Sequence, residues 1–401
     1  MAKTMTAAKK KVIGVAAITG AALLGDSMLI IALPVYWQEF GLTSLWQIGL
    51  LLSINRFIRL PINPLVGLFY QRFELRTGVL LALLIAVGTT AGYGFFNEFW
   101  LLFLMRLLWG VAWSLLRLGG FLTVAEAATE DNTGNLVGLY NGLWGIGGLV
   151  GMLGGGLLVD QTSILFVTSL FAAIGLVMVP AVFILIPLSK VEQEEPAQVK
   201  ASKNWLTVDS GIILVTGAMV GFIIFGLFAS TLSTSIEAHY DIEWNAAGLT
   251  VGAATLAGII QALRWGWDPF IAPKIGKRID SSKTPVLFII VPALIGAVLL
   301  FGLGFVQNIV PLLLLLLLFQ FFSTVFVTTA DTLAVKTASQ THKVKVMTAY
   351  TIVVDVGAAL GPLIAFMLLG TYELAYVYYL AGLMFMMLGI GWVWKQLKQS
   401  Q

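Results

Sequence analysis

The chain has no cysteine and only two histidines among its 401 residues, which excludes several kinds of site at once. Without cysteine there is no disulfide, no thiolate metal ligand and no cysteine nucleophile. The histidines, His239 and His342, fall in separate predicted loops, so they cannot form a His/Cys metal cluster. We therefore predict no metal site, no cofactor and no enzyme of the Ser/His or Cys/His type.

Charged residues are also scarce, at 11% of the chain, whereas a soluble domain carries roughly 25%. Hydrophobic residues make up 59% and are gathered in long runs. Because a helix crosses the hydrocarbon core of a bilayer in roughly 20 apolar residues, such runs predict transmembrane helices. We predict twelve, over residues 12–37, 45–70, 77–96, 99–124, 136–159, 164–188, 210–232, 246–272, 284–306, 310–334, 346–369 and 374–394. The predicted fold class is an all-α membrane protein with twelve transmembrane helices.

The N-terminus has the outline of a signal peptide, because Lys9, Lys10 and Lys11 precede an apolar stretch. That stretch, however, is longer than the roughly 7–15 residues of a signal peptide, and it carries Asp26 near its middle. We interpret it as a first transmembrane helix that is retained.

The basic residues outside the helices all fall on one side of the predicted membrane. Lysines and arginines outside the helices lie only in the two termini and in the second, sixth, eighth and tenth loops. In the odd-numbered loops every charged residue is acidic: Glu39, Glu98, Asp160, Glu237, Asp241, Glu243 and Glu373. The positive-inside rule therefore predicts that both termini are cytoplasmic. A short multi-pass chain of this kind favours a bacterial cytoplasmic (inner) membrane.

A polar stretch at residues 189–206 divides the chain into two six-helix bundles, residues 1–188 and 207–401. Short patterns recur at nearly the same offset in the two halves, including Gly147 and Gly151 with Gly357 and Gly361. Their small-xxx-small spacing predicts close helix packing. Two parallel six-helix repeats are a transporter architecture in which the substrate site lies between the halves.

Several motifs resemble the major facilitator superfamily. The sequence GLFYQRFELR at residues 67–76 keeps Gly67, Arg72 and Arg76 of that family's loop motif, but Gln71 replaces its aspartate. A second copy keeps Gly276 and Asp280. An Arg-xxx-Gly at Arg106 resembles a further motif of the family, and the glycine-rich stretch at residues 142–156 is similar to a motif of its antiporters. Asp26 ahead of Ala-Leu-Pro resembles a pattern of its multidrug exporters.

The resemblance implies a gating role for Arg72, Arg76 and Asp280. It also implies that acidic residues of the fourth loop, among them Glu126 and Asp131, pair with the two arginines as a latch. The alternative is that this loop is simply solvated.

Ionisable residues inside the predicted spans are the candidate substrate and proton sites, because a central charge costs roughly 2.5–3.5 kcal/mol on insertion scales. These residues are Asp26, Arg56, Arg59, Arg106, Arg117, Arg264, Asp268 and Asp355, with Asp331 near a helix end. Burial raises the pKa of a carboxyl group and a neighbouring arginine lowers it, so an alternating cavity would let Asp26 bind and release a proton. The family resemblance places Arg106 beside it. The alternative is a static ion pair that orients the helices.

Arginines outnumber aspartates inside the spans, which favours an anionic or zwitterionic substrate. Arg117 and Arg264 could instead extend to the membrane surface, but Arg56 and Arg59 are too central for that.

We predict a secondary transporter that works by alternating access and exports an amphipathic or anionic organic compound in exchange for protons. The alternative is a proton symporter or anion exchanger that imports a small organic anion or sugar. A membrane-embedded enzyme, a receptor and a channel are less well supported. The expected partners are a small-molecule substrate, protons and the lipid bilayer. We expect a monomer and no nucleic acid.

Overall fold

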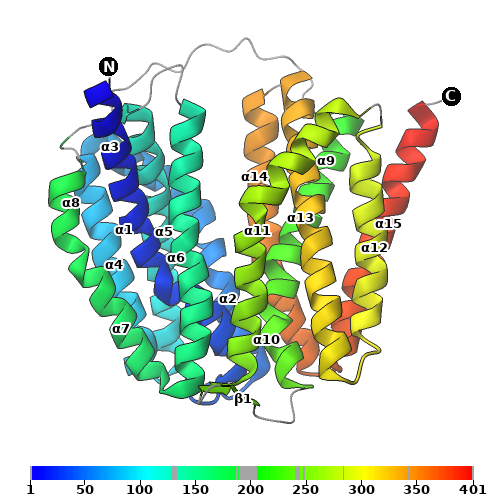
Figure 1. The fold of residues 1–401 in the computed structure, drawn as a ribbon, viewed down its shortest axis with the longest axis horizontal. Helices are drawn as coiled ribbons and strands as arrows, with labels where there is room; N and C mark the ends of the chain where they lie inside the picture. Colours follow the sequence, from blue (N-terminus) through cyan, green and yellow to red (C-terminus); the bar gives the residue numbers. More distant parts are fainter. Residues whose placement is uncertain are drawn as a thin grey trace. The chain divides into compact units, whose positions relative to one another are not determined.

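A computed structural model describes residues 2–127, 133–186, 188, 206–239, 244–246, 249–282, 284–340 and 343–399 (Figure 1). Its elements are α1 (Ala2–Val35), α2 (Leu45–Phe57), α3 (Arg59–Arg72), α4 (Leu75–Phe95), α5 (Phe99–Ala127), α6 (Thr133–Gln161), α7 (Ile164–Val177), α8 (Val179–Leu185), α9 (Val208–Met219), the π-helix η1 (Val220–Phe228), α10 (Ala229–Glu237), β1 (Trp244–Ala246), β2 (Leu249–Val251), α11 (Ala253–Ser281), α12 (Leu287–Leu303), α13 (Ile309–Gln340), α14 (Lys343–Leu369) and α15 (Leu374–Gln399).

The helices follow the twelve predicted stretches, and among the described residues nine are long and apolar enough to cross a bilayer. The second stretch is divided into α2 and α3 and carries several charges. The eighth, α11, is rich in charge, and the ninth, α12, is a shorter helix of 17 residues.

Three predicted helices are interrupted or irregular along their length, and in two of them the interruption comes ahead of a proline. The second ends at Phe57 and restarts at Arg59, since Pro61 has no N–H to donate to the carbonyl of Phe57. The sixth is interrupted at Met178 in the same way, ahead of Pro180. The seventh runs through a π-helical segment that the apolar pattern did not indicate.

The predicted start of the eighth helix at residue 246 is wrong. Trp244–Ala246 and Leu249–Val251 instead pair as antiparallel strands, with Trp244 opposite Val251, and the helix begins at Ala253. The preceding Gly252 has no side chain with which to cap the helix, so the capping acceptor comes from elsewhere in the fold.

The chain forms two compact units, and each of them includes a short segment from the other side of the polar stretch at residues 189–206. One contains Met1–Thr43, Ile54–Gln198 and Glu243–Ala262; the other contains Ser44–Ser53, Val199–Ile242 and Leu263–Gln401. Two short segments are therefore exchanged between the halves of the sequence: the start of α2, and the hairpin with the start of α11. Both α2 and α11 begin in one unit and continue in the other.

Glycines bring the helices close together inside each unit. In the first unit a Cβ on Gly151 of α6 would lie 2.6 Å from the carbonyl oxygen of Leu24 on α1. In the second, a Cβ on Gly361 of α14 would lie 2.5 Å from the backbone nitrogen of Leu227 in η1. Gly147 and Gly357 make equally close approaches, to Gly20 and to Ala218. Small residues at such positions allow helix backbones to pack directly in a membrane.

Candidate functional site

The first unit holds a buried ion pair between Asp26 on α1 and Arg106 on α5. Only 8% of Asp26 and 1% of Arg106 is exposed. Tyr93 on α4 completes the cluster, with its hydroxyl 3.4 Å from Nη1 of Arg106. Three helices thus meet at one carboxylate and one guanidinium, and each charge is stabilised by the other.

The other central arginines of this unit lie on either side of the break between α2 and α3. Arg59 donates from Nε to the carbonyl oxygen of Asn55 at 3.1 Å, and both Arg56 and Arg59 are partly buried. Arg56 lies in the last turn of α2 and Arg59 is the first residue of α3, and Ile58 between the two helices keeps a helical backbone (φ −62°, ψ −27°).

Arg117 on α5 lies among aromatic rings and not beside Asp26. Its guanidinium carbon is 5.2 Å from the ring centre of Phe121, 5.5 Å from that of Trp144 and 5.9 Å from that of Trp113. Such cation–π contacts help to stabilise a buried guanidinium.

The second unit has a polar cluster around Arg264 and Asp268, one turn apart on α11. Nε of Arg264 is 3.9 Å from Oδ2 of Asp268, and Nη1 is 3.5 Å from Oε1 of Gln320 on α13. Thr324, also on α13, donates to Oδ1 of Asp268 at 2.6 Å and accepts from Nε1 of Trp267 at 3.1 Å.

The two buried arginines therefore differ in how firmly they are held. Both are less than 10% exposed. Arg106 has a direct carboxylate partner, whereas the polar contacts of Arg264 with other described residues are long, at 3.5 and 3.9 Å. A guanidinium has five N–H donors, so Arg264 can accept a further anionic or carbonyl group.

Two aspartates in the second unit lie apart from this cluster. Asp331 on α13 accepts from the hydroxyl of Tyr350 on α14 at 2.8 Å. Asp355 on α14 is partly buried and lies apart from the polar side chains of the other described residues.

The structure describes some of the predicted gating residues. A Cβ on Gly67 or Gly276 would have no neighbour within 4 Å among the described residues, so close packing does not explain either glycine. Arg76 donates from Nε to the carbonyl oxygen of Ile186 at 2.9 Å, and Arg72 is exposed at the end of α3.

Of the acidic gating residues, Glu126 pairs with Lys11 at 3.4 Å. Asp131 lies outside the described residues, and so does the side chain of Asp280, whose backbone belongs to α11.

Sequence reasoning missed Tyr93, Gln320, Thr324 and Tyr350. Gln320 carried a usable signal, because it interrupts the apolar run of α13, where a polar side chain requires a partner. The tyrosines and the threonine carried none, because these residue types are common within membrane helices.

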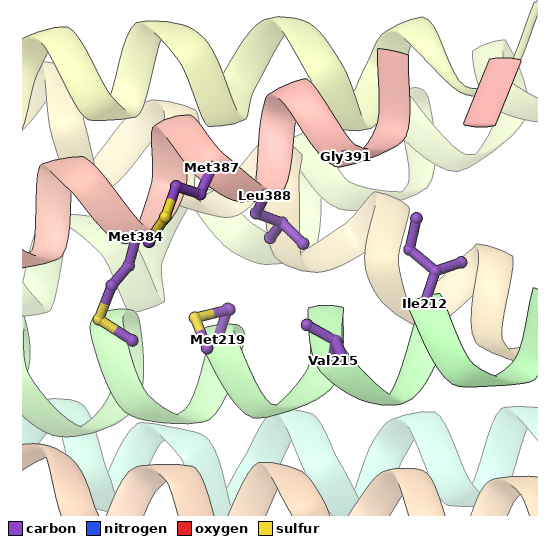
Figure 2. A pocket seen from close by; sticks show the side chains of 7 residues that line it. All are labelled: Ile212, Val215, Met219, Met384, Met387, Leu388 and Gly391. Atoms are coloured by element: carbon purple, nitrogen blue, oxygen red, sulfur yellow. The ribbon is translucent and has the colours of Figure 1, made fainter. Parts of the chain in front are cut away.

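A cavity of about 310 Å³ lies between α9 and α15 in the second unit (Figure 2). Its seven lining residues are Ile212, Val215, Met219, Met384, Met387, Leu388 and Gly391. None of them is charged or can donate a hydrogen bond from its side chain. Val215 and Met387 are more than half exposed, so the cavity opens at the surface and is separate from the charged clusters.

Comparison with known proteins agrees with this arrangement. The family model of the Major Facilitator Superfamily matches residues 15–362. A tetracycline resistance protein of class H from Pasteurella multocida is 22% identical over 321 residues, 77% of each chain.

Solved structures share the fold at lower identity. A bacterial homologue of the human lysosomal transporter Spinster, in an inward-facing conformation, has a TM-score of 0.72 at 13% identity and covers 96% of this chain and 94% of its own. The nucleoside transporter NupG has a TM-score of 0.71 at 15% identity, with coverage of 96% and 98%.

These matches confirm the predicted fold class. The chain is a multi-pass membrane protein of a family of transporters, whose members bind small-molecule substrates within a lipid bilayer. The family model spans most of the sequence, and so this chain belongs to the major facilitator superfamily.

Proposed function

We propose that this protein exports an amphipathic or anionic organic compound in exchange for protons by alternating access. The observation that carries the proposal is the buried ion pair of Asp26 and Arg106 with Tyr93 beside it. A carboxylate that is paired with a guanidinium inside a membrane span can be neutralised by a proton. A conformational change can then expose this carboxylate to one side of the membrane or the other.

Protonation of Asp26 would remove the negative charge that balances Arg106. A buried guanidinium that has lost its counter-charge is costly, so the surrounding helices α1, α4 and α5 would then favour a different arrangement. Proton binding is thereby linked to helix position. Deprotonation toward the less acidic side of the membrane would restore the pair and reset the cycle.

The polar part of the substrate would bind in the second unit, at Arg264. This guanidinium is buried, and its long contacts to Gln320 and Asp268 leave donors for a carboxylate, enolate or carbonyl oxygen. Phe225, whose ring centre is 5.3 Å from the guanidinium carbon of Arg264, and Trp267 would contact the apolar part. An amphipathic compound with an oxygen-rich edge fits this chemistry.

Export is supported by the tetracycline resistance relative. The proposed setting is a bacterial cytoplasmic membrane with both termini in the cytoplasm, and the proposed working unit is a monomer. The two separate charged clusters suit an exchange in which proton and substrate occupy different places.

The alternative function is proton-coupled import of a small organic anion. It is favoured by one feature: protonation of Asp26 would free Arg106 itself to bind an anion, so that proton and anion would bind together. The two functions therefore predict opposite proton movements when substrate binds.

The test is proton release from purified protein in weakly buffered detergent after addition of tetracycline and related amphipathic compounds, at several pH values. An exporter releases protons on binding, and Asp26→Asn abolishes the release while binding persists. Proton uptake on binding would instead establish symport. Release that is unchanged in Asp26→Asn would remove Asp26 from the coupling role and contradict the proposal.

A further inference from the structure

The carboxylate of Asp160, in the last turn of α6, is surrounded by hydrogen-bond donors of the first unit. Its Oδ2 accepts from the backbone N–H of Gly252 at 3.0 Å and from that of Thr255 at 2.8 Å. The hydroxyl of Thr255 donates to the same oxygen at 2.5 Å. The hydroxyl of Tyr36, just after α1, donates to Oδ1 at 2.6 Å.

This carboxylate acts as the N-cap of α11, although it belongs to α6. The first N–H groups of a helix have no partner within the helix, and their dipoles favour a negative charge. Gly252, at the cap position, has no side chain that could serve. A Cβ at that position would lie 2.6 Å from Oδ2 of Asp160, so glycine is what allows the foreign carboxylate to approach.

Close contacts continue along the same two helices. A Cβ on Gly156 of α6 would lie 2.9 Å from the carbonyl carbon of Ala254, and one on Gly258 of α11 would lie 2.7 Å from the carbonyl oxygen of Met152. The first turns of α11 are thus fitted to the end of α6, and Asp160 is the charged group at that contact.

The rest of α11 belongs to the other unit. Residues up to Ala262 are part of the first unit, whereas Leu263 and everything after it, including Arg264, are part of the second. At the start of α2 the relation is reversed, since Ser44–Ser53 belong to the second unit. In that unit a Cβ on Gly49 would lie 2.6 Å from the carbonyl oxygen of Pro362.

We propose that Asp160 is a gating residue, which locks the start of α11 onto α6 in the present state and releases it during each transport cycle. The inference rests on the alternating-access function proposed above. The helix α11 is continuous across the boundary at Ala262. If its first turns follow the second unit when the units rearrange, they leave α6 and the hydrogen bonds to Asp160 break. With both termini cytoplasmic, this gate faces the outside.

The test uses the natural absence of cysteine, because spin labels can be attached without removing any native residue. One labelled pair, Glu39→Cys with Glu373→Cys, reports on the proposed outer ends of the two units. A second pair, Gln71→Cys with Ser281→Cys, reports on the proposed inner ends. All four positions are exposed. Distances are measured without substrate, in the otherwise wild-type chain and in Asp160→Asn.

In Asp160→Asn we expect the population with a long outer distance to rise about tenfold or more relative to the short one, and the inner distance to shorten together with it. A tenfold change corresponds to about 1.4 kcal/mol. Asp160→Glu should restore part of the original distribution. The matched control is Glu98→Gln, an exposed acid in another predicted outer loop, which should leave both distances unchanged.

Two results would overturn the proposal. One is an unchanged outer distribution in Asp160→Asn. The other is broadening of the outer distances with no change at the inner pair, which would make Asp160 a cap that only stabilises the fold. Thr255→Val, which removes one donor and keeps the carboxylate, guards against misfolding of Asp160→Asn and should show the same shift to a smaller extent. Neither substrate nor proton gradient enters the measurement, so its outcome is separate from that of the export test.

Discussion

Arg106 and Asp26 are 80 positions apart in the chain, yet the guanidinium of one donates to the carboxylate of the other inside the first unit. The pair joins α5 to α1, and Tyr93 adds α4. Because both charges are buried, each requires the other, and removing either changes the balance of the whole cluster. This dependence is what would make a single proton on Asp26 able to influence three helices.

Arg106→Gln should lower the free energy of unfolding by about 3–5 kcal/mol, because it leaves the Asp26 carboxylate buried without its cation. The measurement is denaturant unfolding in detergent micelles. In the double variant with Asp26→Asn the loss should be smaller than the sum of the two single losses, since no lone charge remains.

The matched control for that cycle is Lys11→Gln, which removes the pair with Glu126. Both partners there are more than one third exposed, so the cost should be no more than about 1 kcal/mol. Additive losses for Asp26→Asn and Arg106→Gln would show that the two residues do not act as a unit.

Arg264→Gln should weaken substrate binding about 10- to 100-fold, the effect of losing a hydrogen bond from a charged donor worth about 1.5–3 kcal/mol. Its effect on stability should be smaller than that of Arg106→Gln, because Arg264 makes only long polar contacts with the described residues. Binding is measured by calorimetry with the compound that passes the proton-release test.

Lys395→Gln is the comparison for that experiment. Lys395 is also a partly buried cation of the second unit, but it is paired directly with Asp209 at 2.6 Å. Its removal should leave substrate affinity unchanged. Equal weakening by the two substitutions would mean that net charge, and not a specific site at Arg264, governs binding.

The membrane fold could be predicted from the sequence because each helix is indicated by many apolar residues together, so that no single residue decides it. The helix boundaries that were predicted wrongly depend on individual backbone N–H groups and on one distant side chain. Pro61 and Pro180 each remove one N–H, and this divides a helix that the apolar pattern reads as continuous. The start of α11 depends on a carboxylate 92 positions away from Gly252, which no local pattern can indicate.

The candidate site could be predicted only as a set of charged residues that are energetically unfavourable inside a membrane span. Asp26 and Arg264 stand out in the sequence because charge inside a span demands a partner. Which partner each one finds depends on how the helices pack: Arg106 meets Asp26, whereas Arg117, on the same helix, lies against Trp113 and Phe121. Spacing along a helix fixes the face of a residue but not what that face meets.

Tyr36→Phe tests whether the donors around Asp160 contribute separately. It removes one hydrogen bond and leaves the three donors from Gly252 and Thr255 in place. With the outer labelled pair, the population of the long distance should rise by a smaller factor than in Asp160→Asn, about fivefold, which corresponds to about 1 kcal/mol. An effect as large as that of Asp160→Asn would assign the lock to Tyr36.

Gly151→Ala should lower the free energy of unfolding by about 1–3 kcal/mol, because the added methyl group would lie 2.6 Å from the carbonyl oxygen of Leu24 and 2.8 Å from Cβ of Ser27. Gly142, on the same helix, is the matched control, since a Cβ there would have no neighbour within 4 Å among the described residues. Gly142→Ala should be neutral or stabilising by up to about 1 kcal/mol, because alanine favours a helix over glycine. Chemical unfolding of both variants in the same detergent separates the two effects. If both lose stability equally, the glycines of α6 are needed for backbone flexibility; if only Gly151→Ala does, they are needed for contact with α1.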